Sequence, residues 1–355
     1  MVSVTIYDVA AHAGVSIKTV SRVMNDEPNV RPGTRDKVVA SAEALGYHPN
    51  LSARSLAGSR SFVIAAFVDA ALTMDHWRSE RGTDYLTRIQ LGATTQCRQA
   101  GYHFMVELID HQTPRVRQEV KSLLAALKPD GVILTPPSSD DEIVLELLQE
   151  SGTPYARLGP EREGGRGLRL RMDDRAAAAG MTEHLIGLGH RRIAFIVGEP
   201  RYGASRARRE GFLEAMAAHH LPTPDAYILQ GDFTFQSGME AARALLALRE
   251  RPTAIFASND DMALGCLNAL GEAGLSTPED VSVAGFDDSS GARFSRPQLT
   301  TLRQPLVEMA TIAAQRLISG EVPADCDEDA VLGLPPFELV CRRSTAAPAR
   351  LHAAE

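Results

Sequence analysis

The chain has 355 residues, which is long for one ordinary domain and predicts two or three. Hydrophobic residues make up 44% of the chain, enough for substantial cores, and no apolar run is long enough to span a membrane. The amino terminus lacks a basic region followed by an apolar stretch, so we expect no signal peptide and a cytoplasmic protein. The four cysteines, Cys97, Cys266, Cys326 and Cys341, form neither a CxxC motif nor a Cys/His cluster. We therefore expect reduced thiols, no metal and no cofactor.

Charge is distributed unevenly along the chain. The formal net charge is −8, but residues 1–60 carry seven basic and five acidic side chains, a net of +2, which leaves −10 for residues 61–355. A mildly basic head on an acidic body suits a small DNA-reading module whose body is repelled by phosphate.

The segment TIYDVAAHAGVSIKTVSRVMN, residues 5–25, predicts two short helices at 6–13 and 17–24. Gly14 can adopt the left-handed conformation that ends the first helix, and Ser16 is a good N-cap for the second. The second helix has a core side and an opposite arc of donors, a charge and an apolar residue, made by Ile17, Lys18, Ser21, Arg22 and Asn25. This layout is typical of a recognition helix in a major groove, with a solvated helical hairpin as the alternative.

Two further helices continue this module. The stretch VRPGTRDKVVASAEALGYHPN predicts a helix from Pro32 to Leu45, closed by Gly46. The stretch NLSARSLAGSR predicts a short helix capped by Asn50, with Ala53, Leu56 and Ala57 on one side.

From Ser61 the pattern changes to short apolar strands that alternate with helical stretches. The predicted strands are FVIAAFV, YHFMVEL, GVILTPP, RIAFIVG, YILQG, AIFAS and VSVAGFD. This alternation predicts parallel sheets flanked by helices, in two α/β lobes. The Gly-rich stretch EREGGRGLRL is expected to be a mobile crossover. The motifs GxxxxGK[ST], GxGxxG, HExxH and GxSxG are absent, so we expect no enzyme.

Ligands of parallel α/β sheets bind beyond the carboxyl ends of the strands. In the second half of the body these ends lead into a guanidinium, an amide, a carboxylate and an aromatic ring, from Arg206, Asn259, Asp287 and Phe233. Paired hydrogen bonds to neighbouring hydroxyls with a ring beneath an apolar face suit a sugar. For the adjacent Asp260 and Asp288, helix capping is an equal alternative.

Together the two parts resemble the lactose-repressor (LacI/GalR) family of bacterial transcription regulators. The stretches YDVAAHAGVS, TVSRVMN, TRDKV, LGYHPN and ARSLAG fit its head and hinge; HLIGLGHRRIAFI, SNDDMALG, PEDVSVAGFDD and PQLTTLRQP fit its body to about Arg343. The resemblance implies an all-α helix-turn-helix head and an α/β body of two periplasmic-binding-protein-like lobes with parallel sheets, joined by three crossovers.

The resemblance also implies domain boundaries. We expect a helix-turn-helix DNA-binding domain at 1–49, a hinge helix and linker at 50–60, an effector-binding and dimerisation domain at 61–345, and a flexible tail at 344–355. Lobe 1 is expected at about 61–160 and 292–320, and lobe 2 at about 161–291 and 321–343.

By position, the resemblance implies contacts to double-stranded operator DNA from Thr5, Tyr7, Ser16, Ile17, Lys18, Thr19, Ser21, Arg22, Asn25, Asn29, Asn50, Ala53, Leu56 and Ala57. Leu56 occupies the place of a leucine that wedges into the minor groove, where an apolar side chain unstacks a base step and kinks the duplex.

In the body, Arg206, Asn259 and Asp287 match the family's main polar effector contacts and Phe233 its stacking aromatic. Asp173 matches a position that supports the pocket, with a solvated loop acid as the equal alternative.

The first lobe departs from the family pattern. Where many members have a compact loop after the first strand, this chain has the longer, charged stretch DAALTMDHWRSERGTDYL. We expect Tyr85 to supply the first-lobe aromatic and Asp84 a neighbouring contact. Trp77 is expected to anchor this loop, with closure over the ligand as the alternative.

The function that these features imply is a homodimeric transcription repressor whose effector, a sugar, releases it from its operator. The dimer is expected because a head this small reads only a half-site. One alternative is a corepressor-activated regulator that senses a purine or another metabolite. Another, a solute-binding receptor for transport, conflicts with the DNA-reading head. No membrane partner is expected.

Overall fold

The computed structural model describes residues 4–24, 29–47, 60–79, 82–161, 166–322, 327–329 and 337–348. Its internal contacts divide the chain into two units, Met1–Phe62 and Val63–Glu355. Within the described ranges, no helix has the length and apolar character needed to cross a membrane.

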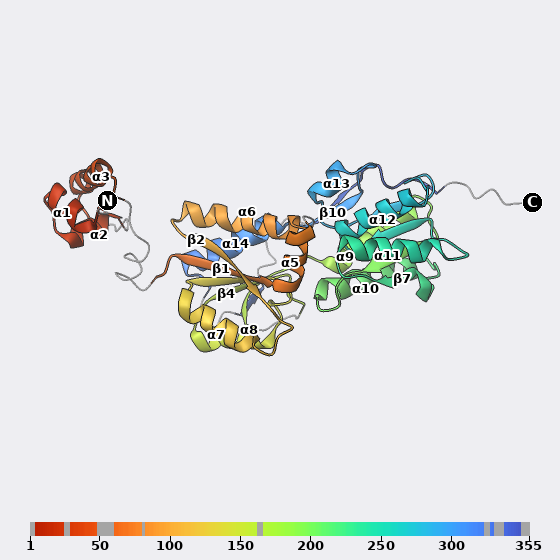
Figure 1. Cartoon of the computed structure of the whole chain (residues 1–355), viewed down its shortest axis with the longest axis horizontal. Helices are drawn as coiled ribbons and strands as arrows, with labels where there is room; N and C mark the ends of the chain where they lie inside the picture. Colours follow the sequence, from red (N-terminus) through yellow and green to blue (C-terminus); the bar gives the residue numbers. More distant parts are fainter. Residues whose placement is uncertain are drawn as a thin grey trace, which may run out of the picture. The chain divides into compact units, whose positions relative to one another are not determined.

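The first unit contains the three head helices predicted from the sequence, labelled α1, α2 and α3 in Figure 1. Their bounds are α1 (Ile6–Ala13), α2 (Ile17–Met24) and α3 (Pro32–Leu45). Gly14 (φ 60°) and Gly46 (φ 63°) end α1 and α3 in the left-handed conformation, which costs a residue without a Cβ little. The helices enclose a small core that includes Val9, Val20 and Val38.

The first lobe of the second unit is built on a six-stranded parallel sheet with the order β11-β5-β4-β3-β1-β2. Helices α6 and α14 cover one face and α7 and α8 the other (Figure 1). The bounds are β1 (Val63–Asp69), α5 (Ala70–Ser79), α6 (Asp84–Gln99), β2 (His103–Ile109), α7 (Val116–Leu127), β3 (Gly131–Leu134), α8 (Glu142–Ser151), β4 (Tyr155–Leu158), β5 (Gly167–Leu170), α14 (Leu306–Ser319) and β11 (Asp327–Asp329).

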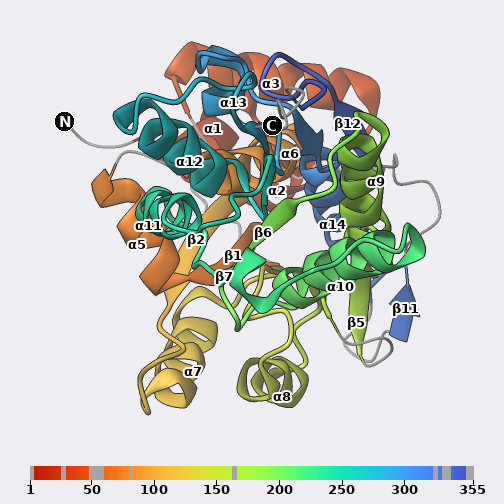
Figure 2. The ribbon, with the colours of Figure 1, turned by 90° about the vertical axis from the view of Figure 1, so that its right-hand side faces the viewer.

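The second lobe contains a four-stranded parallel sheet with the order β7-β6-β8-β9. Helices α9 and α10 lie on one side of this sheet and α11 and α12 on the other (Figure 2). The bounds are α9 (Asp174–Gly187), β6 (Ile193–Val197), α10 (Gly203–Ala218), η1 (Asp225–Tyr227), β7 (Ile228–Gln230), α11 (Phe235–Leu246), β8 (Ala254–Ala257), α12 (Asp260–Glu272), β9 (Ser282–Ala284), α13 (Ser290–Phe294), β10 (Thr301–Arg303) and β12 (Glu338–Val340).

All seven strands predicted from the sequence are confirmed, but the sequence did not predict β4, β5, β10, β11 or β12. Two predicted loops are wrong. The end of the Gly-rich crossover forms β5, and most of the charged stretch after β1 forms the helix α5. The parallel sheets are confirmed, with an additional antiparallel pair of β10 and β12.

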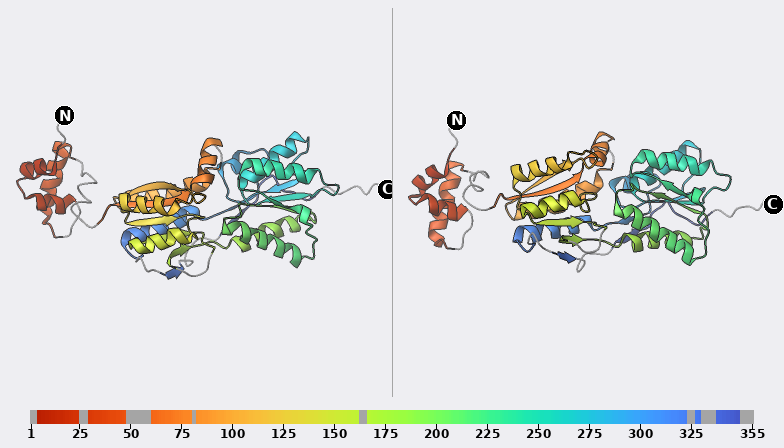
Figure 3. Two further views of the ribbon diagram at one scale, coloured as in Figure 1. Left: turned by 60° about the horizontal axis from the view of Figure 1, so that its bottom comes forward. Right: turned by 90° about the horizontal axis from the view of Figure 1, so that it is seen from below.

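The elements divide between the lobes differently from the expected boundaries. Strand β5 pairs with β4 in the first sheet, beyond the expected start of lobe 2 at residue 161, and β11 pairs with β5. Helix α13 packs on α12, and β10 bridges toward β9, so both lie with lobe 2. Of the stretch 292–320 that was expected in lobe 1, α14 does lie there; Figure 3 shows this blue helix among the orange and yellow elements.

The expected tail is also shorter than residues 344–355. Ser344 is buried, and its hydroxyl donates to the backbone oxygen of Val283 at 2.6 Å. The backbone N–H of Ala346 donates to the Ser282 hydroxyl at 3.1 Å. These contacts join residues 344–346 to β9, so they belong to lobe 2.

Candidate functional site

In the head, helix α2 presents its first turn to solvent. The Ser16 hydroxyl accepts a hydrogen bond from the Thr19 backbone N–H at 3.1 Å and contacts the Thr19 hydroxyl at 2.9 Å, which caps the helix. Ile17 is 41% exposed and Lys18 is exposed, whereas Val20 on the opposite face is fully buried. The core therefore orients Ile17 and Lys18 outward.

The other head candidates are exposed, half-buried or outside the described residues. The backbone N–H and hydroxyl of Thr5 donate to the Asp8 carboxylate at 2.8 and 2.7 Å. These bonds from Thr5 lower the pKa of Asp8. Tyr7 and Asn29 are exposed, and Ser21 and Arg22 are half-buried. The remaining predicted contacts lie outside the described residues: Asn25, Asn50, Ala53, Leu56 and Ala57.

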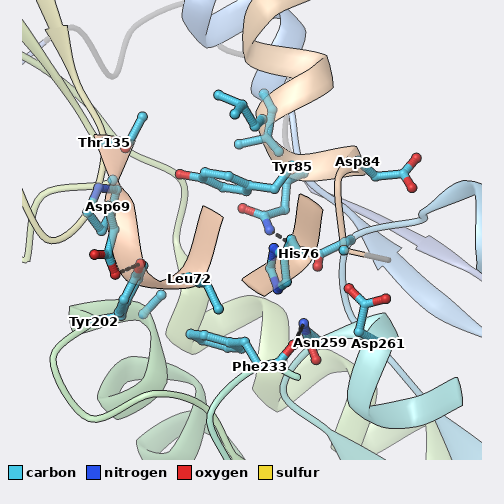
Figure 4. Close-up of a pocket in the computed structure, with 18 of the residues that line it drawn as sticks. Asp69, Leu72, His76, Asp84, Tyr85, Thr135, Tyr202, Phe233, Asn259 and Asp261 are labelled. Carbon is cyan, nitrogen blue, oxygen red and sulfur yellow. Dashed lines mark hydrogen bonds between the residues drawn. The ribbon is translucent and has the colours of Figure 1, made fainter. Parts of the chain in front are cut away.

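In the second unit, a cavity of about 120 Å³ is lined by residues of both lobes (Figure 4). It lies beyond the carboxyl ends of the parallel strands, where such sheets bind ligands. Five of the seven predicted effector contacts line it: Asp84, Tyr85, Phe233, Asn259 and Asp287. The two others, Arg206 and Asp173, do not line it.

Arg208 takes the place predicted for Arg206. The Arg206 side chain is 57% exposed and pairs with Glu161 at the surface, whereas the Arg208 side chain is 5% exposed and lines the cavity. Both lie in the first turns of α10, and residues two apart on an α-helix point to nearly opposite sides. Inspecting the carboxyl ends of the strands located the start of α10, but it could not show which side chains of α10 face the cavity.

The contacts of Arg208 leave one terminal nitrogen for a ligand. Its Nε donates to Asp174 and its Nη1 to the backbone oxygen of Ser258, both at 2.7 Å. The guanidinium also lies 3.6 Å from the centre of the Phe286 ring. In the described part of the chain nothing pairs with Nη2. Asp174 likewise replaces Asp173, which caps α9 by accepting from the Ala176 N–H at 2.8 Å.

Asp287 and Asp288 form a strained turn at the cavity, with φ of 127° and 55°. Such angles are unfavourable for residues with a Cβ and persist where surrounding contacts enforce them. Here Arg88 of α6 donates to both backbone oxygens, at 2.9 Å to Asp287. Gln304 donates to one Asp287 carboxylate oxygen. Burial raises the pKa of Asp287 to about 6, although Arg208 and Gln304 oppose the shift.

Asp288 joins neighbouring segments through ion pairs and does not cap a helix. Its fully buried carboxylate accepts from three arginines: Arg293 at 2.9 Å, Arg303 at 2.7 Å, and Arg342. Burial alone would raise its pKa, but the arginines outweigh burial and lower the pKa. Asp260 is also buried and accepts from the Ser289 N–H and the Thr301 hydroxyl, at 2.7 and 2.5 Å.

Asn259 positions Phe233. Its side-chain amide donates to the Phe233 backbone oxygen at 2.9 Å, and its side-chain oxygen accepts from the Met262 N–H at 3.0 Å. Phe233 has a φ of 69°, and its ring packs so close to Gly198 that a Cβ there would lie 2.1 Å from a ring carbon. Asn259 thus fixes the backbone of Phe233, which carries the ring, through one of its two amide hydrogens.

Among the cavity residues from lobe 1, Asp69 and His76 were not predicted from the sequence, whereas Trp77 lies where the alternative of closure over the ligand would place it rather than as a loop anchor. Asp69 ends β1, and its carboxylate accepts from the hydroxyl of Tyr202 in lobe 2 at 2.9 Å. His76 and Trp77 line the cavity from α5. Asp69 is the last residue of β1, so inspecting the strand ends in the first half of the body would also have found it.

The two predicted lobe 1 contacts differ in what they offer. The Asp84 carboxylate accepts from the backbone N–H and hydroxyl of Ser290, at 3.0 and 2.9 Å, and so joins α6 to α13. Burial raises the pKa of Tyr85, which therefore presents a neutral hydroxyl. No group of three or more His, Cys, Asp or Glu side chains in the described ranges is placed to hold a metal ion.

Comparison with known proteins places both units in known families. Residues 5–50 match the family described as bacterial regulatory proteins, lacI family, and residues 182–345 match the periplasmic binding protein-like domain. The probable HTH-type transcriptional repressor ExuR of Bacillus subtilis is 33% identical over 89% of this chain and 91% of its own length.

Two solved structures resemble the whole chain. A complex of the transcriptional regulator CelR with cellobiose has a TM-score of 0.69 and 31% identity, over 96% of this chain and 99% of that chain. The lac repressor dimer bound to operator and the anti-inducer ONPF has a TM-score of 0.78 and 28% identity, over 98% of this chain and 100% of that chain. The chain belongs to the lacI family of bacterial regulatory proteins.

Proposed function

We propose that this protein is a sequence-specific transcriptional repressor whose affinity for operator DNA changes when a sugar binds between its two lobes. One observation carries the proposal: the chain holds a helix-turn-helix head with an outward-facing second helix, and separately a cavity lined with hydrogen-bonding groups from both lobes. As a regulator of bacterial genes it would act in the cytoplasm.

The relatives support each part of this proposal. The lac repressor structure shows a protein of this architecture as a dimer on its operator with a small molecule bound, and the CelR structure holds a disaccharide. We extend the homodimer, the operator and the sugar to this chain. Its head alone is small and reads a half-site, so two copies are needed to recognise a full operator.

The cavity suits binding better than catalysis. A Ser–His–Asp arrangement does occur in lobe 1, where His111 contacts Asp141 at 2.7 Å and Ser138 at 2.8 Å. However, Ser138 is fully buried and does not line the cavity, and Asp141 is occupied as the N-cap of α8. A serine nucleophile must reach its substrate, so we interpret this arrangement as structural.

The experiment is a selection of duplex DNA from a random-sequence pool by the purified full-length protein, followed by a thermal-shift screen against sugars. We expect a palindromic operator with two half-sites and at least one sugar that raises the melting temperature and weakens operator binding. A sugar that strengthens operator binding would identify a corepressor-activated regulator instead. Failure to enrich any DNA sequence would contradict the proposed function.

A further inference from the structure

Helix α5 is an unexpected wall of the cavity. It begins directly after β1, where the Asp69 carboxylate accepts from the Ala71 N–H at 3.2 Å. Four of its residues line the cavity: Leu72, Thr73, His76 and Trp77. The spacings 72/76 and 73/77 are those of neighbours on one helix face, so α5 directs a single face at the ligand space.

His76 is the polar residue of this face that carries the argument. Its Nε2 is buried and has no hydrogen-bond partner within the described residues. Figure 4 shows the imidazole in the middle of the cavity, between Tyr85 on one side and Phe233 with Asn259 on the other. A buried polar nitrogen without a partner is costly, and a ligand in the cavity would supply the missing partner.

Gly82 makes room for the imidazole. Its φ of 69° is left-handed, and a Cβ at this position would lie 2.6 to 2.7 Å from three atoms of the His76 ring. Close packing against Gly82 thus holds the ring in place. Burial lowers the pKa of His76, although Asp75 and Asp232 oppose the shift. A neutral imidazole has one nitrogen that donates and one that accepts, which suits a hydroxyl group.

The remaining polar groups of the cavity also suit hydroxyls. Both carboxylate oxygens of Asp69 and of Asp84 already accept from protein groups. The Asn259 amide donates one of its two hydrogens to Phe233. An atom remains for a ligand on Arg208 and Asp287 from lobe 2 and on Tyr85 and His76 from lobe 1. The spare groups thus face one another across the cavity.

The charge of the lining opposes an anionic ligand. Five carboxylates line the cavity against one guanidinium: Asp69, Asp84, Asp174, Asp261 and Asp287 against Arg208. The guanidinium is already paired with Asp174. The volume of about 120 Å³ is of the same order as the roughly 150 Å³ that holds one benzene molecule, which favours a ligand of one ring over a ligand of several.

We infer that His76 contacts the effector and sets its specificity, and that the effector is an uncharged, hydroxyl-rich ring of monosaccharide size. This inference rests on the proposed sugar-responsive function and narrows it. In the complex, the His76 imidazole forms a hydrogen bond with one hydroxyl of the sugar. The carboxylates of the cavity exclude sugar acids and sugar phosphates.

The test uses calorimetry on the full-length protein with D-glucose, D-galactose, D-mannose and D-ribose, each beside a charged counterpart: D-glucuronate, D-galacturonate, D-mannuronate and D-ribose 5-phosphate. We expect a neutral sugar to bind, and its charged counterpart to bind roughly tenfold more weakly or worse. Tighter binding of a charged counterpart would overturn the uncharged class.

The role of His76 is tested on the sugar that binds. His76→Leu should weaken binding roughly tenfold, the loss of one well-made hydrogen bond, and His76→Gln should keep part of the affinity. Arg78→Ala, on the outward side of the same helix, should bind as the wild type does. Without sugar, His76→Leu should melt no lower than the wild type, because it removes an unpaired buried nitrogen.

Two results would overturn the role of His76: wild-type affinity in His76→Leu, or a lowered melting temperature with affinity unchanged, which would mark a structural residue. If no sugar of either kind binds while the protein still selects an operator, this inference falls together with the sugar effector. Loss of the operator selection would instead overturn the DNA-binding function, so the two failures are distinguishable.

Discussion

Asp287 links the chemistry of the cavity to its backbone. The residue sits in a strained turn, its carbonyl oxygen is held by Arg88, and its carboxylate faces the ligand space with one oxygen bonded to Gln304. Poor hydration makes ionisation of this carboxylate unfavourable in the free protein. A hydroxyl-bearing ligand that donates to it would favour the ionised form.

The first prediction is therefore a pH dependence of effector affinity. The folded-state pKa of Asp287 is about 6, above its ordinary value of 3.8, so ligand-free protein holds an extra proton that an effector must displace at acid pH. Affinity should fall as pH drops below about 6, by up to tenfold per pH unit, and level off above about 7. Calorimetry across this range measures it.

Asp287→Asn is the control for the pH dependence: its affinity should be lower and nearly constant between about pH 5 and 7.5. A wild-type affinity for the effector that does not change with pH would contradict the role of Asp287 as a ligand contact.

The raised pKa of Asp287 also changes the stability of the protein with pH. Between 3.8 and about 6 the folded chain binds more protons at Asp287 than the unfolded chain does, so the contribution of this group to the free energy of unfolding falls as pH rises through that window.

The second prediction compares two neighbouring arginines. Arg208→Ala removes a buried, cavity-lining guanidinium and should reduce effector affinity by about 2 kcal/mol or more. Arg206→Ala removes a solvated side chain and should change affinity by less than about 0.5 kcal/mol. Calorimetry on both variants decides between the two positions, and the reverse order of losses would restore Arg206 to the pocket.

At the scale of single elements, the third prediction concerns α2. Lys18 is exposed at the start of the helix, next to the exposed Ile17. If Lys18 reads a base edge, Lys18→Ala should cost about 1–3 kcal/mol of operator affinity and relax the preference at one operator position. Repeating the DNA selection with the variant shows this. An equal loss on every sequence would indicate a phosphate contact instead.

The fourth prediction concerns α5. Trp77 is the only tryptophan of the chain; it lines the cavity and is 47% exposed, so it does not anchor the segment from within a core. Effector binding should exclude water from the indole and shift its fluorescence to shorter wavelength. A titration of fluorescence against sugar, with Asp287→Ala as the non-binding control, measures this. An unchanged spectrum at saturation would remove Trp77 from the ligand-facing surface.

An element could be predicted from the sequence where residues close to it in the chain determine its structure. Helices α1 to α3 follow from caps and apolar spacing within a few residues, such as Ser16 and Gly46, and their predicted bounds are confirmed. Helix α5 carries many charged and polar residues and lacks such a signal. Strands β5 and β11 are short and are defined by pairing with distant segments, which no local pattern reports.

The candidate site shows the same limit. Strand ends led to Phe233, Asn259 and Asp287, because topology brings strand ends together wherever the sheet is parallel. The rotation of a helix depends on its packing, which is why the sequence pointed to Arg206 rather than Arg208. His76 could not be predicted, because its role depends on a helix that the sequence did not indicate.

At the scale of the whole molecule, the proposed function is a coupling of two binding reactions. An effector that weakens operator binding must itself bind more weakly to the operator-bound protein, by the same factor. Such couplings are typically roughly 5- to 150-fold. A variant that cannot bind the effector but keeps its head should therefore remain a repressor that no longer responds.

The most direct measurement is the Kd for a selected operator duplex as the effector is titrated in, for the wild type and for Asp287→Ala. We predict that the wild-type Kd rises with effector and levels off at a plateau. The Asp287→Ala protein should match the effector-free wild type at every concentration. A sugar that saturates the wild-type cavity without changing the Kd, or an Asp287→Ala protein that responds as the wild type does, would contradict the effector-controlled repressor.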